Sequence, residues 1–412
     1  MRLPIVLVMK LDLTQFPLMG DDITQRLFQI FREEGAEARF VGGCVRDAVL
    51  GVSAHDIDMA IPIVPDDIIY CLTKANINVI PTGYEFGTIT AVLENRTFQI
   101  TSLRKDWETD GRHAQVTYGT DWKEDASRRD FTINALYADA QGTIYDYFDG
   151  LKDLKFGMIR FVGDAHTRIQ EDYLRILRYF RFLAWYGQGP VNLEAIQACT
   201  ALHQGLKDLS RERIGYEFLK LLSAPDPLSS LRLLSKAGIA PHILPRPINL
   251  DAFESLLNFE KVPRVMCRLA AISLPKIDVA SVAKTLRLSR DQKNYLQYCQ
   301  NRLDHYPSSE KTIYANLYHD GVELFEDLTR LSLTLRTASS TRSILEATLN
   351  ISASWRHPTF PIQGKDLVGM GVKPGPKLGD LLKQCEAWWI AQNFQPNRDT
   401  CLKWIRDRQQ SV

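Results

Sequence analysis

The stretch that decides the fold reads Val41-Gly-Gly-Cys-Val-Arg-Asp47 and continues through Gly51 to His55-Asp-Ile-Asp58. Strand-forming residues precede Gly42 and Gly43, and two glycines allow the tight turn by which a strand enters a helix. Apolar residues at helical spacing follow the turn, and Gly51 closes them. The sequence therefore predicts a strand, a glycine turn and a short helix whose first free N–H groups face a phosphate.

Two carboxylates follow on the next predicted strand. Asp56 and Asp58 are two residues apart, so both point to one face of a strand while Ile57 and Met59 point to the other. Paired carboxylates are a costly like-charge arrangement unless a divalent cation relieves it. An ordinary turn followed by a solvated strand is the simpler interpretation, but the order and spacing of all these residues favour a phosphate and metal site.

This order of residues resembles the first motif of the class II tRNA nucleotidyltransferase and bacterial poly(A) polymerase family, a branch of the polymerase-β-like superfamily. The matching residues are Gly42, Gly43, Val45, Arg46, Asp47, Asp56 and Asp58. The resemblance implies an α+β fold, in which a small mixed β-sheet nucleotidyltransferase head precedes an all-α neck, body and tail. It also implies nucleotide binding by Gly42, Gly43, Arg46 and Asp47, and catalysis with Mg²⁺ at Asp56 and Asp58.

A second run, Ser127-Arg-Arg-Asp-Phe-Thr-Ile-Asn-Ala-Leu136, combines cations, an acid and an amide with a predicted helical face. Arg128 and Arg129 offer a fixed fork of donors to phosphate, and Asp130 and Asn134 would be neighbours on a helix that could bind ribose hydroxyls. A capped helix with a solvated basic end is the alternative. The run resembles the family's second motif, which implies ribose and triphosphate binding, and residues 146–153 resemble its third, a joint between head and neck.

Base selection is expected at Glu171-Asp172-Tyr173-Leu174-Arg175. Asp172 and Arg175 are three apart, hence neighbours on one predicted helix face. The carboxylate only accepts and the guanidinium only donates, which suits the amine and ring nitrogen of cytosine and adenine and disfavours guanine and uracil. A surface ion pair is the alternative. The run resembles the family's base-recognition motif, although Tyr173 stands where many members have proline.

Arg178 and Arg181 continue this helix as a basic row that reaches either the nucleotide or the RNA, and residues 210–214 resemble the next neck motif. A structural helix held by salt bridges is an equal alternative for both. One further departure concerns Gln99, because many relatives carry an acid near that position. We therefore expect the site to work with Asp56 and Asp58 alone.

The resemblance divides the chain into a catalytic head over 1–150, a helical neck for base recognition over 151–225, and a helical body and tail for tRNA binding over 226–412. The polar residues 104–123 are predicted to form a long loop, which in the family serves A addition. Proline-rich segments at 224–227 and 244–247 are predicted joints. Further predictions are helices over 22–34 and 65–75, a strand over 77–80, a hairpin turning at 94–96, and helices beyond 160.

Composition limits the class of protein. With 412 residues, 45% of them apolar, the chain can bury more than one core, and its net charge of +1 argues against a protein that coats nucleic acid. Seven cysteines without a Cys-x-x-Cys pair indicate neither a disulfide framework nor a zinc site. The apolar run at 1–9 is too short to span a membrane, and Met9 is a second candidate start. We expect a soluble cytoplasmic protein without a membrane partner; the oligomeric state is not predicted.

Three activities share these motifs in the family: addition of CCA to the tRNA 3′ end from CTP and ATP, partial addition, and poly(A) synthesis. The segment 81–87 lacks the basic residues typical of the poly(A) polymerases, and the loop at 104–123 disfavours a CC-only enzyme. An A-adding enzyme and a poly(A) polymerase stay as alternatives. A non-catalytic RNA-binding protein on this scaffold is disfavoured because both aspartates are present, and His319-Asp320 alone does not indicate a phosphohydrolase.

Overall fold

A computed structural model describes residues 10–53, 56–106, 116–303, 306, 312–335 and 339–410. The chain divides into two compact units, up to Ile243 and from Leu244. The division falls at the second predicted proline-rich joint. His55, the start of the chain and residues 107–115 of the predicted loop lie outside the described residues.

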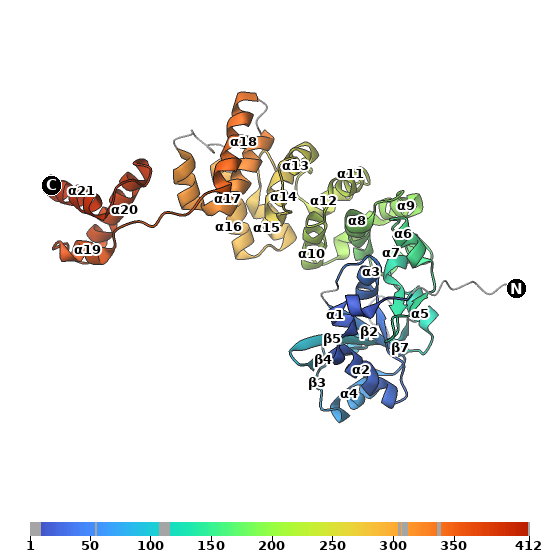
Figure 1. The fold of residues 1–412 in the computed structure, drawn as a ribbon. Helices are drawn as coiled ribbons and strands as arrows, with labels where there is room; N and C mark the ends of the chain where they lie inside the picture. The colour runs from blue at the N-terminus through green and yellow to red at the C-terminus, as the bar shows by residue number, and fades with distance from the viewer. Residues whose placement is uncertain are drawn as a thin grey trace. The chain divides into compact units, whose positions relative to one another are not determined.

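The first unit is built around a mixed sheet, of which Figure 1 labels β2, β3, β4 and β5. The sheet has seven strands in the order β3-β4-β5-β2-β1-β8-β9. The strands are β1 (Arg39–Val41), β2 (Ile57–Ile61), β3 (Asn78–Ile80), β4 (Thr88–Leu93), β5 (Arg96–Ser102), β8 (Leu136–Ala138) and β9 (Ile144–Asp146). β2 runs parallel to β5, and the other neighbouring pairs are antiparallel. Glu94 and Asn95 turn the β4–β5 hairpin with positive φ, as predicted.

Alternation along β4 and β5 gives the sheet one buried face, as strand periodicity requires. Ile89, Ala91, Phe98 and Ile100 are almost fully buried on it. The helices α2 (Asp22–Glu33) and α4 (Pro65–Lys74) lie close to the predicted bounds, and α4 packs against β3, β4 and β5. Asp21 caps α2 by accepting a hydrogen bond from the Thr24 N–H, at 2.9 Å.

Both described ends of the predicted loop form secondary structure. Its two ends pair as the antiparallel strands β6 (Arg104–Asp106) and β7 (Val116–Tyr118), and α5 (Trp122–Ser127) begins within its last residues. Asp121 caps α5 through the Lys123 N–H, at 2.8 Å. The prediction of an unstructured connection over 104–123 was therefore wrong at both ends. The shorter elements of the head are η1 (Leu13–Gln15), α1 (Pro17–Gly20), α3 (Gly43–Val49), η2 (Tyr84–Phe86), η3 (Thr132–Asn134) and α6 (Gly150–Lys155).

Beyond the sheet the first unit is helical, as predicted. Its helices are α7 (Ala165–Glu171), α8 (Leu174–Tyr186), α9 (Leu193–Leu202), η4 (His203–Asp208), α10 (Arg211–Leu222), α11 (Leu228–Lys236) and α12 (Ala240–Ile243). α8 packs against α10 and α11. Phe131 ties α8 to the head, because its ring lies 5.1 Å from the ring of Phe182 and 4.9 Å from that of Phe161.

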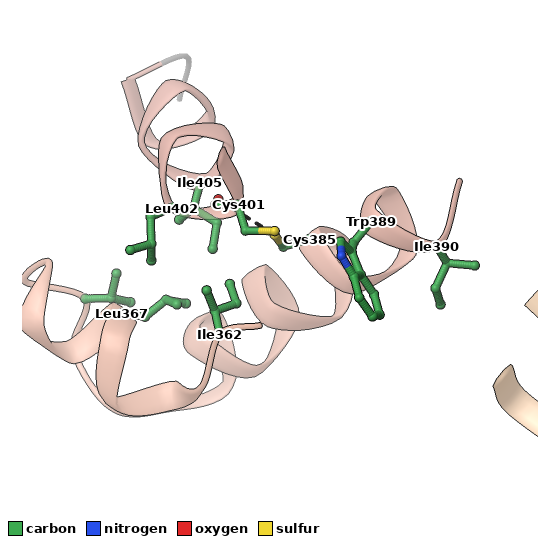
Figure 2. Packing of buried hydrophobic residues seen from close by; sticks show 9 residues of the cluster. Ile362, Leu367, Cys385, Trp389, Ile390, Cys401, Leu402 and Ile405 are labelled. Carbon is green, nitrogen blue, oxygen red and sulfur yellow. Dashed lines mark hydrogen bonds between the residues drawn. The ribbon is translucent and has the colours of Figure 1, made fainter. Parts of the chain in front are cut away.

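The described part of the second unit is helical throughout. It comprises α13 (Leu250–Leu257), α14 (Val265–Ile272), α15 (Val279–Leu286), α16 (Arg290–Arg302), α17 (Ile313–Leu335, kinked at Gly321), α18 (Ser339–Ala353), α19 (Gly364–Gly369), α20 (Pro376–Ala391) and α21 (Arg398–Gln410). Figure 2 shows how α19, α20 and α21 direct Leu367, Cys385, Cys401 and Ile405 toward a common core. Within the described ranges, no helix combines the length and apolarity needed to cross a membrane.

Candidate active site

The predicted glycine turn joins β1 to α3. Gly42 has φ 73° and ψ −121°, a region open essentially only to glycine, and its N–H donates to the Leu136 carbonyl on β8 at 3.0 Å. A Cβ at Gly42 would lie 3.6 Å from Nη1 of Arg129. Gly42 is buried and Gly43 is half-buried, so the turn brings the main chain close to a guanidinium, an arrangement that suits a phosphate oxygen.

Asp56 immediately precedes β2 and is exposed, whereas Asp58 lies within β2 and is half-buried. Burial raises the pKa of Asp58, the Arg129 guanidinium opposes that rise, and the charge of Asp56 adds to it. Over the described residues, neither carboxylate accepts a hydrogen bond from, or forms an ion pair with, another side chain. The two acids thus form an open like-charge pair on the sheet.

This pair fits a hard divalent cation. Mg²⁺ is held in proteins by one or two carboxylates while phosphate and water oxygens complete its shell. The described residues contain no cluster of three or more acidic, histidine or cysteine ligands, so a metal here would rest on Asp56 and Asp58 together with oxygens of the substrate. Gln99 lies directly beside Asp58 in the parallel β2–β5 register, which places a neutral amide where a third acid would extend the pair.

The arginines of the second motif are fixed by a residue that the sequence prediction missed. Asp125 is fully buried and accepts from Nε of Arg128 at 2.9 Å, from Nη2 of Arg129 at 3.1 Å and from the Tyr137 hydroxyl at 2.6 Å. Burial alone would raise the pKa of Asp125, but the two guanidiniums hold it down to about 2. The spacing of Asp125, three and four residues before the arginines, is the helical signal that could have found it.

The predicted helix over the second motif is wrong. After α5 the chain bends at Arg129 and Asp130, Phe131 forms a β-bridge with Phe161, and only η3 follows. Asp130 and Asn134 still meet, because the Asn134 amide donates to Asp130 at 3.0 Å. Both side chains are more than nine-tenths buried, so in this conformation they contact protein partners.

Arg46 of the first motif points inward. Its guanidinium donates to Asn134 at 2.7 Å and to Asp47 at 2.9 Å, and it lies 4.3 Å from the ring centre of Tyr186 on α8. Its exposed fraction is 7%. Arg46 therefore joins the glycine turn, the second motif and α8 into one rigid assembly.

Arg178 and Arg181 are also held by acids. Nε of Arg178 donates to Asp130 at 2.7 Å, and Nε of Arg181 lies 3.1 Å from Glu217 of α10. Burial raises the pKa of Glu217, and both arginines lower it. Glu217 was not predicted; it lies three residues beyond the predicted neck motif at 210–214.

Asp172 and Arg175 do not share one helix face, contrary to the prediction. The helix breaks between α7 and α8, where Asp172 is extended (φ −153°) and accepts from the Leu174 N–H at 3.0 Å. Arg175 lies in the first turn of α8 and forms an ion pair with Glu171, while Asp172 pairs with Arg213 at 2.8 Å. The two residues remain adjacent, since the Arg175 N–H donates to the Asp172 carbonyl at 3.0 Å.

A mixed sheet with a glycine turn after β1 and an open carboxylate pair on β2 defines a polymerase-β-like nucleotidyltransferase head. The family model described as "Poly A polymerase head domain" matches residues 38–160, and a model of tRNA nucleotidyltransferase domain 2 matches residues 266–405.

Two relatives cover most of the chain. A mouse protein named CCA tRNA nucleotidyltransferase 1, mitochondrial, is 36% identical over 97% of this chain and 93% of its own. The CCA-adding enzyme of Lactobacillus delbrueckii subsp. bulgaricus is 32% identical over 85% of this chain and 89% of its own. The chain therefore belongs to the tRNA nucleotidyltransferase and poly(A) polymerase family.

Solved structures agree on the fold. The Bacillus stearothermophilus CCA-adding enzyme in complex with CTP superposes with a TM-score of 0.72 at 24% identity, covering 94% of this chain and 97% of that one. The Thermotoga maritima CCA-adding enzyme complexed with tRNA gives a TM-score of 0.64 at 19% identity, covering 97% and 100%. At these identities the likeness concerns the fold alone, and it confirms the predicted sheet head and helical remainder.

Proposed function

We propose that this chain is a CCA-adding tRNA nucleotidyltransferase. It transfers CMP and AMP from CTP and ATP to the tRNA 3′ end, releases pyrophosphate and uses no nucleic-acid template. The observation that carries the proposal is the open pair Asp56 and Asp58 beside the glycine turn, in a chain that matches named CCA-adding enzymes over almost its full length.

The position of each group of residues suggests its role in nucleotide binding. The main chain at Gly42 and Gly43 leaves room for the triphosphate, and Arg128 and Arg129, held by Asp125, supply positive charge beside it. Arg46, Asp47, Asp130 and Asn134 form the network that fixes the turn and binds the ribose. Because these groups are already in place, catalysis is mostly positioning and electrostatic stabilisation.

The family generally uses a divalent metal ion, and we propose that it is Mg²⁺, held by Asp56 and Asp58. When bound, the ion neutralises charge on the triphosphate and on the leaving pyrophosphate. The contribution of this chain is to hold Asp58 half-buried close to the charge of Asp56, a repulsion that a bound cation would relieve.

Base selection is proposed for Asp172 and Arg175. Asp172 pairs with the partly exposed Arg213, so this ion pair can give way to a base edge at small cost. Arg175 is held more firmly, because its guanidinium also donates to the carbonyls of Arg168 at 2.8 Å and Arg128 at 3.1 Å. Arg178 and Arg181 support this site through Asp130 and Glu217. The helical break at Asp172 leaves the two residues joined by a main-chain hydrogen bond while their side chains have different partners.

The division into a catalytic head (1–150), a neck (151–225) and a tRNA-binding body and tail (226–412) is part of the proposal. Cytoplasmic location is also proposed; the mouse relative is named as mitochondrial. An A-adding enzyme is the second candidate, because β6 and β7 provide an ordered base for the loop that A addition uses in the family.

The test uses a tRNA transcript that lacks its 3′ CCA, Mg²⁺, and CTP, ATP or both, followed by sequencing of the product ends. CCA that forms with both nucleotides and then stops supports the proposal. Addition of A only to a CC-ended transcript indicates an A-adding enzyme, and long A tails indicate a poly(A) polymerase. Absence of extension under every condition refutes all three.

A further inference from the structure

Part of the sheet face that carries Asp58 is accessible. In the strand register Asp58 pairs with Gln99, and Gln99 pairs with Thr90, which pairs with Ile80 on β3. Paired residues on neighbouring strands share a face, so these four side chains form one row. Ile80 and Gln99 are exposed, and Thr90 is half-buried. We call the surface formed by Ile80, Thr88, Thr90, Gln99 and Thr101 the open face.

On the half of the sheet formed by β1 and β8, the face that carries Asp58 is covered. Val41 of β1, Ala60 of β2 and Tyr137 of β8 are buried in one core cluster, against which Trp122 and Phe148 pack. Asp58 therefore lies at the border between a covered half, which holds the glycine turn, and the open face.

A rigid aromatic turn lies at the end of the open face. Tyr84 and Phe86 of η2 stand between Gly83 and Gly87, which both have positive φ. Phe86 is 62% exposed and Tyr84 is 42% exposed, although hydrogen bonds fix the turn. The Tyr84 hydroxyl donates to Asp66 at 2.7 Å. The turn also closes on itself, since the Phe86 N–H donates to the Gly83 carbonyl at 2.8 Å.

We propose that the open face and the aromatic turn bind the acceptor strand of the RNA, a single strand that ends in the 3′-hydroxyl. This inference rests on the proposed function. The triphosphate site lies on the β1 side of Asp58, so the attacking hydroxyl must come from the other side, where β5 and β4 form the open face. In-line transfer requires the attacking hydroxyl and the leaving pyrophosphate to lie on opposite sides of the transferred phosphorus.

The chemistry of the surface suits that strand. Threonine hydroxyls and the Gln99 amide can both donate to and accept from ribose and phosphate groups. Exposed aromatic rings stack on unpaired bases of any sequence. From strand spacings, Thr88 lies about 12 Å from Asp58, so the adjoining turn reaches bases a few nucleotides before the 3′ end.

The test compares the double variant Tyr84→Ala/Phe86→Ala with Phe156→Ala. Phe156 is 57% exposed and follows α6, outside the open face and the aromatic turn, so it serves as an exposed aromatic control. Loss of one stacked base should raise the KM for a tRNA transcript lacking CCA by about 5- to 150-fold. The KM for CTP and kcat at saturating tRNA should stay at wild-type values, and Phe156→Ala should change none of these.

A second measurement is independent of catalysis. We would place 2-aminopurine in turn at each of the last three nucleotides of the transcript and record its fluorescence on binding. Quenching at one or more positions with the wild-type protein and with Phe156→Ala, but not with the double variant, supports the inference. An unchanged KM for tRNA and equal quenching by all three proteins overturn it, as does a rise in the KM for CTP alone. If the wild type quenches the probe but never extends the transcript, the proposed function fails while the binding surface stands.

Discussion

Arg178→Ala tests the ion pair that joins the second motif to α8. Asp130 is 8% exposed, and Arg178 donates to it at 2.7 Å, whereas the side chain of Arg178 is 30% exposed. Removing one partner of a buried ion pair leaves an uncompensated charge, which destabilises the fold by about 3–5 kcal/mol. Because the Arg178 side chain is partly exposed to solvent, we expect the low end of this range. The free energy of unfolding should fall by about 3 kcal/mol, measured by urea denaturation at pH 7.

The loss of stability in Arg178→Ala should depend on pH. Burial alone would raise the pKa of Asp130, but Arg178 and Asn134 hold it below its usual value. A lowered pKa stabilises the fold above the unfolded value of about 3.9, and that contribution disappears as pH falls through the folded pKa. Without Arg178, burial raises the pKa of Asp130, so protonation relieves the penalty in the variant and the difference from the wild type should narrow between pH 7 and pH 4.

Two controls sharpen this experiment. Adding Asp130→Asn to Arg178→Ala removes the buried charge, so the double variant should be more stable than Arg178→Ala alone. Lys74→Ala breaks an ion pair of 2.6 Å with Glu34 at an exposed position, and it should leave the urea midpoint close to wild type. A loss under about 1 kcal/mol for Arg178→Ala, or a loss equal at pH 7 and pH 4, would refute the reasoning.

Three further predictions concern the site. Asp58→Asn should lower CMP transfer by about a hundredfold or more, because metal-held charge is worth several kcal/mol, while the urea midpoint stays near wild type. Arg175→Ala should reduce the preference for CTP and ATP over UTP and GTP by roughly tenfold, measured by misincorporation on a tRNA transcript. Gly42→Ala, at φ 73° and ψ −121°, should cost about 1–3 kcal/mol in urea denaturation, and Gly35→Ala, at φ 78° with no atom within 4 Å, should cost less.

The first motif could be predicted because its structure is local. Two glycines at a turn and alternation along the next strand specify their conformation with little help from distant residues, and Gly42 and β2 lie as expected. The same holds for the hairpin turn at Glu94 and Asn95, because asparagine is a turn residue that tolerates positive φ. The roles of these residues in catalysis stay predictions, since their geometry is consistent with the roles but does not measure them.

The second motif misled sequence reasoning because tertiary contacts override its helical spacing. Phe131 leaves the helical path to pair with Phe161, which lets Asp130 accept from Arg178, 48 residues later. No local pattern encodes such a distant partner. At Asp172 a local signal did exist, because aspartate competes with helix interiors by bonding nearby main-chain N–H groups, here that of Leu174, and the predicted continuous helix overlooked it.

The buried acids explain how the site keeps so many arginines close together. Asp125 balances Arg128 and Arg129, and Asp130 with Glu217 balances Arg178 and Arg181. Each guanidinium is thus fixed before a nucleotide arrives, so the entropy of ordering long side chains is lost on folding rather than on binding. Asp56 and Asp58 differ, because neither forms an ion pair or a side-chain hydrogen bond with a described residue. These arginines are thus neutralised internally while the two aspartates form an open negative pair, and under the proposed function that pair directs a cation to the boundary between nucleotide and acceptor strand.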